Sequence, residues 1–394
     1  MTDRTPAEAT ASTPEPDASA DLIAARRQKL RFLREELGVD PYGGRVDGLV
    51  TLDSARATFD ESAHEAFDAD PEGEDSRPRV LVAGRVMQHR DMGKLVFMTL
   101  RDHSGDLQVS VSKAQCEAGM FRLAKKLDYG DLVVAGGAMG RTKRGEICVW
   151  ADRIEIHAKS LTPPPEKWHG LNDPEIRFRR RYVDLHANPE AIQALQDRSR
   201  IVSRMRSFME RRDFLEVETP MMQPMAGGAA ARPFVTHHNT LDLDLYLRIA
   251  PELYLKRLLV GGLPRVFEIN RNFRNEGVDR SHNPEFTALE VYEAFGDCWT
   301  MLELTESMLH ELAVASAEDR RARGDDTVGG TPEAPILPFD GIPVNWAKPF
   351  EQVTYSELFE RGTGFGIQDE SAVRAKAADS SWMPKPVPRS KSSE

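Results

Sequence analysis

Alternating hydrophobic and polar positions divide the N-terminal part of the chain into short strands. Strand side chains point to opposite faces in turn, so this alternation indicates half-buried strands. A helical stretch at 113–127 separates the first three strands from the last two. Three strands, a helix and two strands are the order of a five-stranded OB-fold barrel, whose open face binds single-stranded nucleic acid. The strand segments are 80–87, 95–100, 107–112, 132–138 and 147–156.

The C-terminal part mixes helices and strands. A long amphipathic helix is predicted from about 189 to 212, because Ile201, Val202, Met205 and Phe208 recur at helical spacing. Residues 318–338 are polar and rich in Gly and Pro, and the pattern is lost after 350–359. The predicted fold class is α+β, with the barrel followed by an antiparallel sheet with helices. The other predicted elements are a strand at 214–220, a strand leading into a helix at 246–257, a hairpin at 265–292 and a helix at 299–317.

Composition places the domain boundaries. Residues 1–20 are rich in Thr, Ala, Pro and Ser without periodicity, which is typical of a disordered tail. The run Thr-Pro-Pro-Pro at 162–165 predicts a stiff connector between two domains. The expected organisation is a tail at 1–20, a helix plus barrel at 21–161, a linker at 162–176, a second domain at 177–375 and a disordered or aberrant tail at 376–394.

The hairpin at 265–292 concentrates the candidate chemistry. On its first strand Glu268, Asn270, Asn272 and Arg274 share one face, and on its second strand Phe286, Glu290 and Tyr292 do the same. In an antiparallel hairpin the two sets can meet on one surface. An arginine and carboxylates beside two aromatic rings favour a ligand site over an ordinary half-polar hairpin.

Overall composition limits the protein class. The chain has 394 residues, of which 40% are hydrophobic and 29% charged, which suits a soluble protein with two substantial cores. No apolar run has the length of a membrane span and no signal-peptide core begins the chain, so a cytoplasmic protein without membrane association is expected. Cys116, Cys148 and Cys298 stand alone, which predicts reduced packing residues and no zinc site.

Charge and ring positions bear on nucleic-acid binding. The net charge of −11 argues against a protein that coats nucleic acid with its whole surface, but local basic patches remain open. The helix predicted at 21–37 carries Arg26, Arg27 and Lys29, which suit either a solvated face or contacts to RNA phosphates. Phe97 and Gln108 lie on candidate binding strands, where a ring can stack on a base and an amide can read its edge. Any barrel also contains a Phe and a Gln, so this signal is weak alone.

Several motifs together resemble one enzyme family. The run Phe-Arg-Asn-Glu at 273–276 resembles motif 2 of the class II aminoacyl-tRNA synthetases, and the helix and strand ending at Pro220 resemble motif 1. Across about residues 21 to 370 the chain is most similar to the bacterial lysyl-tRNA synthetases. The motifs that carry this likeness are 181–185 (RYVDL), 217–222 (VETPMM), 227–229 (GGA), 231–234 (ARPF), 247–257 (LRIAPELYLKR) and 267–277 (FEINRNFRNEG).

The resemblance implies a function and roles for residues. It implies a lysine–tRNA ligase that uses ATP with Mg²⁺, L-lysine and tRNA(Lys) and forms a homodimer through motif 1. Arg274 would bridge the ATP α-phosphate and the amino-acid carboxylate, because a guanidinium donates to both in a fixed fork. The implied ATP residues are Arg274, Glu276, His282, Asn283 and Phe286; the implied amino-acid residues are Gly228, Glu252, Arg274, Glu290 and Tyr292; the implied tRNA residues are Phe97, Gln108, Arg90, Glu146, Arg26, Arg27 and Lys29.

The sequence departs from the family pattern near its end. The glycine-rich motif 3 with its arginine and the acidic strand that holds Mg²⁺ are not found in residues 295–394, and the glycines at 362–366 predict only a turn. The expectation is therefore a chain truncated before motif 3, with the metal ligands beyond residue 394 and with low stability or no aminoacylation. One alternative is a fragment that binds tRNA without catalysis. A further alternative is an aspartyl- or asparaginyl-type ligase.

Overall fold

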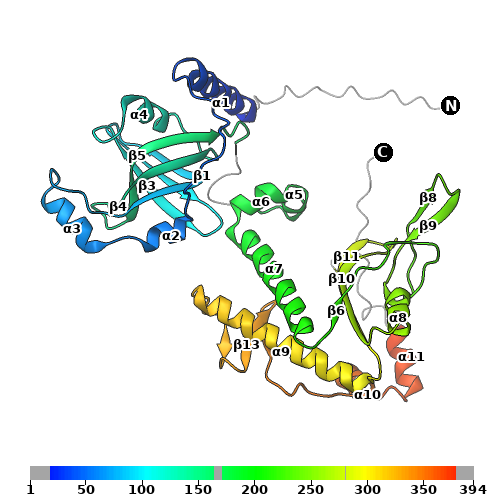
Figure 1. Ribbon diagram of the computed structural model, residues 1–394. Helices are drawn as coiled ribbons and strands as arrows, with labels where there is room; N and C mark the ends of the chain where they lie inside the picture. The colour runs from blue at the N-terminus through cyan, green and yellow to red at the C-terminus, as the bar shows by residue number, and fades with distance from the viewer. Residues whose placement is uncertain (1–17, 164–170, 280, 379–394) are drawn as a thin grey trace, which may run out of the picture. The chain divides into compact units, whose positions relative to one another are not determined.

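The computed structural model describes residues 18–163, 171–279 and 281–378, and its contacts divide the chain into two units, residues 1–195 and 196–394 (Figure 1). Residues 1–17, 164–170, 280 and 379–394 lie outside the described part, and with them lie nearly all of both predicted tails and half of the polyproline run at 162–165. Within the described ranges, no helix is long and apolar enough to cross a membrane.

The first unit is built on a closed five-stranded barrel in the order β1-β2-β3-β5-β4. All neighbouring strands are antiparallel except β3 and β5, which pair in parallel. This order confirms the OB-fold prediction, although the helix between β3 and β4 is shorter than the predicted 113–127. The elements are β1 (Arg79–Asp91), β2 (Leu95–Arg101), β3 (Asp106–Ser112), α4 (Ala118–Ala124), β4 (Leu132–Arg141) and β5 (Ile147–Ala158).

The barrel interior explains why these segments form strands. In β2, Val96, Met98 and Leu100 are buried while the alternate residues are partly exposed. Burying one such side chain contributes roughly 1.5–3 kcal/mol, so the period-two pattern fixes which residues face inward. At a bulge between β4 and β5, a Cβ on Gly137 would lie 2.0 Å from the Trp150 carbonyl oxygen, so only glycine allows this close approach.

Helices close the two ends of the barrel (Figure 1). Helix α1 (Ala18–Glu35) and α4 lie at one end, and α2 (Leu52–Ala57) and α3 (Glu61–Ala69) lie at the other. Leu33 of α1 and Leu52 of α2 enter the barrel core. The predicted start of the first helix at Asp21 is wrong, because α1 begins at Ala18 and Asp21 lies in its first turn. Two short helices, α5 (Pro174–Arg179) and α6 (Arg181–Ala187), precede the long helix α7 (Pro189–Glu210).

The second unit centres on the predicted hairpin, whose strands β10 (Arg265–Phe273) and β11 (Glu285–Glu293) form a sheet in the order β11-β10-β6. The predicted strand at 214–220 is reduced to β6 (Leu215–Glu216), which pairs in parallel with β10. One face of this sheet packs on α7 and α9 (Cys298–Ala322) through Phe208, Phe267 and Met308. A second sheet has the order β7-β9-β8 and leads into α8. These elements are β7 (Met222–Gln223), β8 (Val235–His238), β9 (Leu243–Leu247) and α8 (Glu252–Val260).

The region after α9 differs from the prediction. Residues 318–338, for which the sequence indicated only a polar stretch rich in Gly and Pro, include β12 (Gly329–Gly330) and β13 (Pro335–Phe339), which form a sheet with β14 (Ile342–Asn345). Prolines in these strands hid the strand pattern, because proline cannot donate to a strand ladder. The loss of pattern after 350–359 was also a wrong expectation. Two helices follow there, α10 (Tyr355–Thr363) and α11 (Glu370–Ala378).

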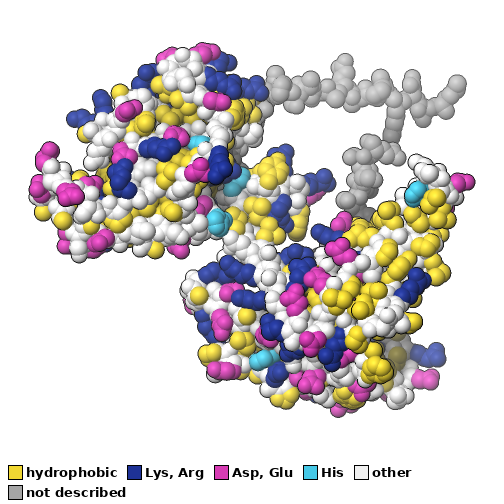
Figure 2. All heavy atoms as spheres, viewed as in Figure 1, with side chains coloured by type: hydrophobic (Ala, Val, Ile, Leu, Met, Phe, Trp, Pro, Cys, Tyr) yellow, Lys and Arg dark blue, Asp and Glu magenta, His cyan; other side chains and the backbone are white. Residues whose placement is uncertain are grey.

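Surface exposure corrects one further expectation. Cys116 and Cys148 are buried, whereas Cys298 at the start of α9 is exposed and is not a packing residue. In the second unit, hydrophobic side chains gather over the region of β8, β9 and α8 (Figure 2). Val235, Leu241 and Val260 are among the exposed ones there. Clustered exposed apolar side chains are typical of surfaces that contact another molecule.

A cluster of buried charged side chains joins segments of the barrel domain, and removing one of these charges should lower the stability of the protein. Asp131, which is fully buried, accepts hydrogen bonds from Lys159 Nζ at 2.8 Å, from Ser160 N at 2.8 Å and from Asp128 N at 2.7 Å. Asp131→Asn removes one of the two carboxylates that neutralise the buried ammonium of Lys159. The free energy of unfolding should fall by about 3 kcal/mol, measured by urea unfolding.

The control is Asp152→Asn, which removes an exposed ion pair with Arg79. Its expected loss is below about 1 kcal/mol. Equal effects of the two substitutions would contradict the special role of the buried cluster.

Candidate functional site

The hairpin register brings the predicted residues to one face. Glu268 lies opposite Glu290, Asn272 lies opposite Phe286, and Tyr292 follows Glu290 by two residues on β11. Directly opposite residues of an antiparallel pair share a face. Phe267, in contrast, points into the core on the other face. One face of the sheet therefore carries the polar and aromatic side chains, and the other face packs in the hydrophobic core.

Arg274 lies just beyond the end of β10, and the backbone continues the strand pairing there. Its backbone N–H donates to the Pro284 carbonyl at 2.8 Å. The guanidinium carbon lies 5.0 Å from the centre of the Phe286 ring. Among the described residues, the buried Nε of Arg274 and the buried Oδ1 of Asn272 have no hydrogen-bond partner. A guanidinium held beside a ring with donor capacity left is suited to binding a phosphate or carboxylate.

A half-buried acidic cluster of Glu252, Glu290 and Tyr292 lies on the side of the hairpin that also carries Arg274. Tyr292 Oη donates to Glu290 Oε2 at 3.0 Å. Burial raises the pKa of Glu290, and the negative charges of Glu252 and Glu268 raise it further against the opposing effect of Tyr292 and Arg248. Burial and the charge of Glu290 also raise the pKa of Tyr292. Such a cluster stabilises an ammonium group and repels a second carboxylate.

Glycine at 228 allows the chain to pass closely over Glu252. Gly228 has φ +87°, and a Cβ there would lie 2.9 Å from the Glu252 Cβ. Glu252 is the first residue of α8 and accepts from Lys256 Nζ at 2.5 Å. The structure thus brings Gly228, Glu252, Glu290 and Tyr292 into one region.

A buried ion pair forms the floor of this region. Arg248 Nη1 donates to Glu268 Oε1 at 2.6 Å, and both side chains are almost fully buried. Arg248 Nε donates to the Arg271 carbonyl at 2.8 Å, and Thr219 Oγ1 donates to Glu268 Oε2 at 2.7 Å. The pair therefore joins three separate segments of the chain. Arg248 was not predicted as a site residue, although an arginine within the apolar run at 246–250 is a signal for a paired buried charge.

The loop between β10 and β11 carries the remaining ATP candidates. Glu276, His282 and Asn283 are all exposed. The His282 ring lies 2.9 Å from the Asp279 carboxylate, which is held by the backbone N–H groups of Ser281 and His282. These contacts, led by the N–H of Ser281, lower the pKa of Asp279. The expected contacts of Glu276, His282 and Asn283 with ATP stay predictions.

The barrel groups four predicted RNA residues in one groove. Phe97 points outward between the buried Val96 and Met98, and Arg90 lies directly opposite it on β1. A groove of about 1090 Å³ is lined by Arg90, Phe97, Gln108 and Glu146, among others. An outward-facing ring is not needed for packing the barrel, so its position favours the stacking interpretation over the core one.

Two basic side chains of helix α1 contact the barrel, which the sequence did not predict. Arg26 donates to the carbonyls of Ser160 at 2.8 Å and Tyr129 at 3.0 Å, and Lys29 Nζ lies 2.5 Å from Asp128. Arg27 is exposed. Arg26 and Lys29 therefore dock α1 on the barrel, and their expected contacts to RNA phosphates stay a prediction.

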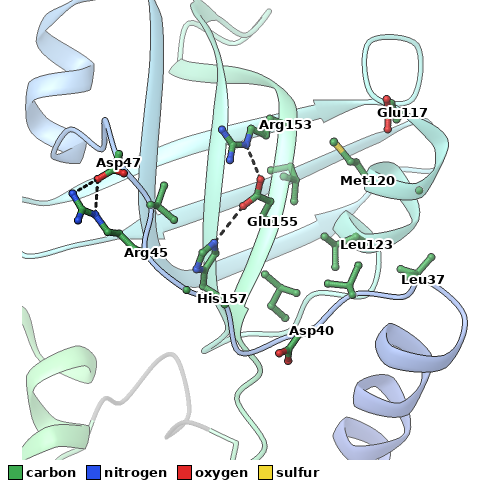
Figure 3. A pocket seen from close by; sticks show the side chains of 17 residues that line it. Leu37, Asp40, Arg45, Asp47, Glu117, Met120, Leu123, Arg153, Glu155 and His157 are labelled. Atoms are coloured by element: carbon green, nitrogen blue, oxygen red, sulfur yellow. Dashed lines mark hydrogen bonds and ion pairs between the residues drawn. The ribbon is translucent and has the colours of Figure 1, made fainter.

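A second hollow of about 590 Å³ lies elsewhere on the barrel, between the segment after α1, α4 and β5 (Figure 3). Figure 3 shows a chain of polar contacts across it, from Arg153 to Glu155 at 2.7 Å and from Glu155 to His157 at 3.3 Å. Arg153, followed by His157, lowers the pKa of Glu155. This hollow shares no lining residue with the groove at Phe97.

No group of three or more His, Cys, Asp or Glu side chains within the described residues is arranged to hold a metal ion. The carboxylates of the hairpin face therefore do not fit a bound Mg²⁺.

Comparisons with known proteins agree on both parts of the chain. Residues 173–382 match the family described as tRNA synthetases class II (D, K and N), and residues 80–164 match the OB-fold nucleic acid binding domain. The lysine–tRNA ligase of Magnetococcus marinus is 51% identical over 91% of this chain and 70% of its own length. That of Carboxydothermus hydrogenoformans is 43% identical over 91% of this chain and 68% of its own length. The chain thus spans about two thirds of the length of the curated relatives it matches.

The acidic cluster gives a test by pH. Because the pKa of Glu290 is raised in the folded protein, its contribution to stability is present in acid and is lost as the pH rises through that pKa. Glu290→Gln should therefore match the wild type most closely below about pH 4 and become the more stable protein at pH 7, by less than about 1 kcal/mol because solvent screens the half-exposed group. Urea unfolding at a series of pH values measures this difference.

The control is Glu285→Gln on the same strand, which removes an exposed ion pair with Arg271 and should give no gain at pH 7. A Glu290→Gln protein that is less stable than wild type at pH 7 and no less stable in acid would contradict the electrostatic account.

Proposed function

Because the chain belongs to the class II aminoacyl-tRNA synthetases of the aspartate, lysine and asparagine group, we propose that it acts as a lysine–tRNA ligase. The first step would join L-lysine to ATP, and the second would transfer the lysyl group to tRNA(Lys). The observation that carries the choice of lysine is the acidic cluster of Glu252, Glu290 and Tyr292 on the side of the hairpin that carries Arg274.

The proposed first step needs no protein nucleophile. A carboxylate oxygen of lysine attacks the α-phosphorus of ATP, the bond between the α-phosphorus and the bridging oxygen breaks, and pyrophosphate leaves with that oxygen. Arg274 would hold the two anions together and stabilise the charge on the phosphate, while Phe286 would stack on adenine. The position of the guanidinium over the Phe286 ring supports this pairing of roles. Glu276, His282 and Asn283 complete the proposed ATP set.

Substrate charge separates lysine from aspartate and asparagine. The lysine side chain ends in an ammonium, which Glu290 and Tyr292 would accept, while Glu252 and Gly228 would receive the α-amino group. An aspartate side chain would place a carboxylate beside Glu290, whose own ionisation is already disfavoured. The acidic cluster thus favours a cationic amino acid.

The domain assignment follows from the same proposal. Residues 21–161 would bind the anticodon loop through Phe97, Gln108, Arg90 and Glu146, with Arg27 as a further phosphate contact. Residues 177–375 would carry the catalytic domain. Homodimerisation through motif 1 and a cytoplasmic location are proposed from the family alone. Ile201, Met205 and Phe208 of α7 pack in the unit's own core and therefore do not by themselves indicate a dimer interface.

The second candidate function is an RNA-binding module without catalysis, which the groove on the barrel would support by itself. Two measurements on the same sample separate the candidates. A ligase should bind both tRNA(Lys) and a non-hydrolysable lysyl-adenylate analogue. An RNA-binding module should bind the tRNA alone.

Binding of the analogue by calorimetry tests the ligase proposal. The lysyl form should bind at least about 100-fold more tightly than the aspartyl form, since one misplaced charge changes the binding free energy by several kcal/mol. Arg274→Ala should weaken binding of the lysyl form by roughly 10- to 100-fold, because it leaves the phosphate mimic and the lysyl carbonyl without their shared donor. Arg274→Lys should recover only part of the loss, because an ammonium lacks the fork.

The matched control is Arg271→Ala on the same strand, whose exposed guanidinium pairs with Glu285. It should bind the analogue as the wild type does. Tighter binding of the aspartyl form, or wild-type affinity in Arg274→Ala, would reject the proposal.

A further inference from the structure

A row of side chains crosses the outer face of the barrel. The strand register sets Arg90 opposite Phe97, Phe97 opposite Ser110, and Ser110 opposite Trp150. Paired residues share a face, so Phe97 and Trp150 stand on the same surface two strands apart. Two strand spacings are roughly 10 Å, which is too far for one base to touch both rings face to face. Ser110 between them is fully buried and forms the floor.

The neighbouring β4 strand accommodates the Trp150 ring closely. A Cβ on Gly140 would lie 2.8 Å from Trp150 Cδ1 and 3.2 Å from Arg77 Nη1. The indole therefore lies low against the β4 backbone, beside Arg77. It lines the same groove as Phe97. This leaves an indole at the far end of the groove that the sequence analysis did not identify.

Helix α3 forms a wall beside this ring. Its Glu61 is held by both terminal nitrogens of Arg141, and its Phe67 ring lies 3.5 Å from the guanidinium carbon of Arg77. These two contacts fasten the helix to β4 and to the start of β1. His64 of α3 lines the groove as well. The wall is therefore fixed to the barrel rather than free to swing.

His64 supplies an unused polar atom at this wall. The residue is 8% exposed, and its Nδ1 has no hydrogen-bond partner within the described part of the chain. The Asp68 carboxylate lies on its Nε2 side at 3.7 Å. That arrangement favours a proton on Nε2 and leaves Nδ1 as an acceptor. A buried acceptor without a partner is unfavourable unless a ligand supplies the donor.

We infer that Trp150 and His64 form a second base-binding subsite in the groove, next to the one at Phe97. The ligand would be an unpaired RNA base that lies on the indole and donates an N–H to His64 Nδ1. Single-stranded RNA with splayed bases is read in this way, by stacking on a ring and by a hydrogen bond to the base edge. This inference rests on the proposed function, because it assumes that the groove holds RNA. It adds a residue from α3 and one from β5 to the specificity of that binding.

The test measures the affinity of the full chain for the tRNA(Lys) anticodon stem-loop and for versions in which each loop base is replaced in turn. Trp150→Ala should weaken binding of the native loop by about 10-fold or more, and His64→Ala by roughly 3- to 10-fold. Both should remove the discrimination at one loop position, adjacent to the position whose discrimination Phe97→Ala removes. Trp150→Phe and His64→Asn keep a ring and a polar atom and should restore most of it.

The control variant is His157→Ala, which makes the same change in the other hollow of the barrel (Figure 3) and should leave every affinity unchanged. Thermal unfolding of each variant checks that the barrel is intact. The subsite would be overturned if Trp150→Ala and His64→Ala distinguished the loop variants as the wild type does, or if they lost affinity equally for every loop variant. Neither result would overturn RNA binding by the groove. A wild-type chain that does not distinguish the loops at all, with Phe97→Ala equally without effect, would overturn RNA reading by the groove and the subsite with it.

Discussion

The buried ion pair between Arg248 and Glu268 is the interaction on which the candidate site depends. Its members come from the chain before α8 and from β10, and Thr219 of a third segment binds both. Removing one partner would leave a buried charge and cost about 3–5 kcal/mol. The pair therefore fixes the start of α8, with Glu252, against the strand that leads to Arg274. The two halves of the proposed amino-acid site are joined through it.

The same pair also contributes to the electrostatics of the acidic cluster. Arg248 lowers the pKa of Glu290 while Glu268 raises it, and burial outweighs both. The hairpin register decides which residues take part, because a slip of one residue would exchange the faces. Phe267 and Ile269 pack toward α7 and α9, and this packing holds Glu268 and Asn270 on the other side. One face of the strand pair thus packs in the core, and the opposite face carries the proposed ligand site.

Sequence patterns could predict the parts that depend on local periodicity. The barrel strands, the hairpin and the meeting of Arg274 with Phe286 follow from period-two alternation and antiparallel pairing. The buried partner of Arg248 could not be identified from the sequence, because it depends on a contact between distant segments. The strands around Pro335 were hidden by their prolines, and α3 with His64 is a nine-residue helix with a weak apolar pattern. The docking roles of Arg26 and Lys29 depend on carbonyls and a carboxylate of the barrel that no local pattern identifies.

The central claim is that the hairpin face binds an adenylate with Arg274 between the phosphate and the lysyl carbonyl. A crystal structure of the chain with a lysyl-adenylate analogue tests it most directly. The account predicts adenine stacked on Phe286, the Arg274 guanidinium in contact with the phosphate mimic and the lysyl carbonyl, and the lysine ammonium within hydrogen-bond distance of Glu290 or Tyr292. An analogue bound away from this face, or bound on it with Arg274 turned to solvent, would contradict the account.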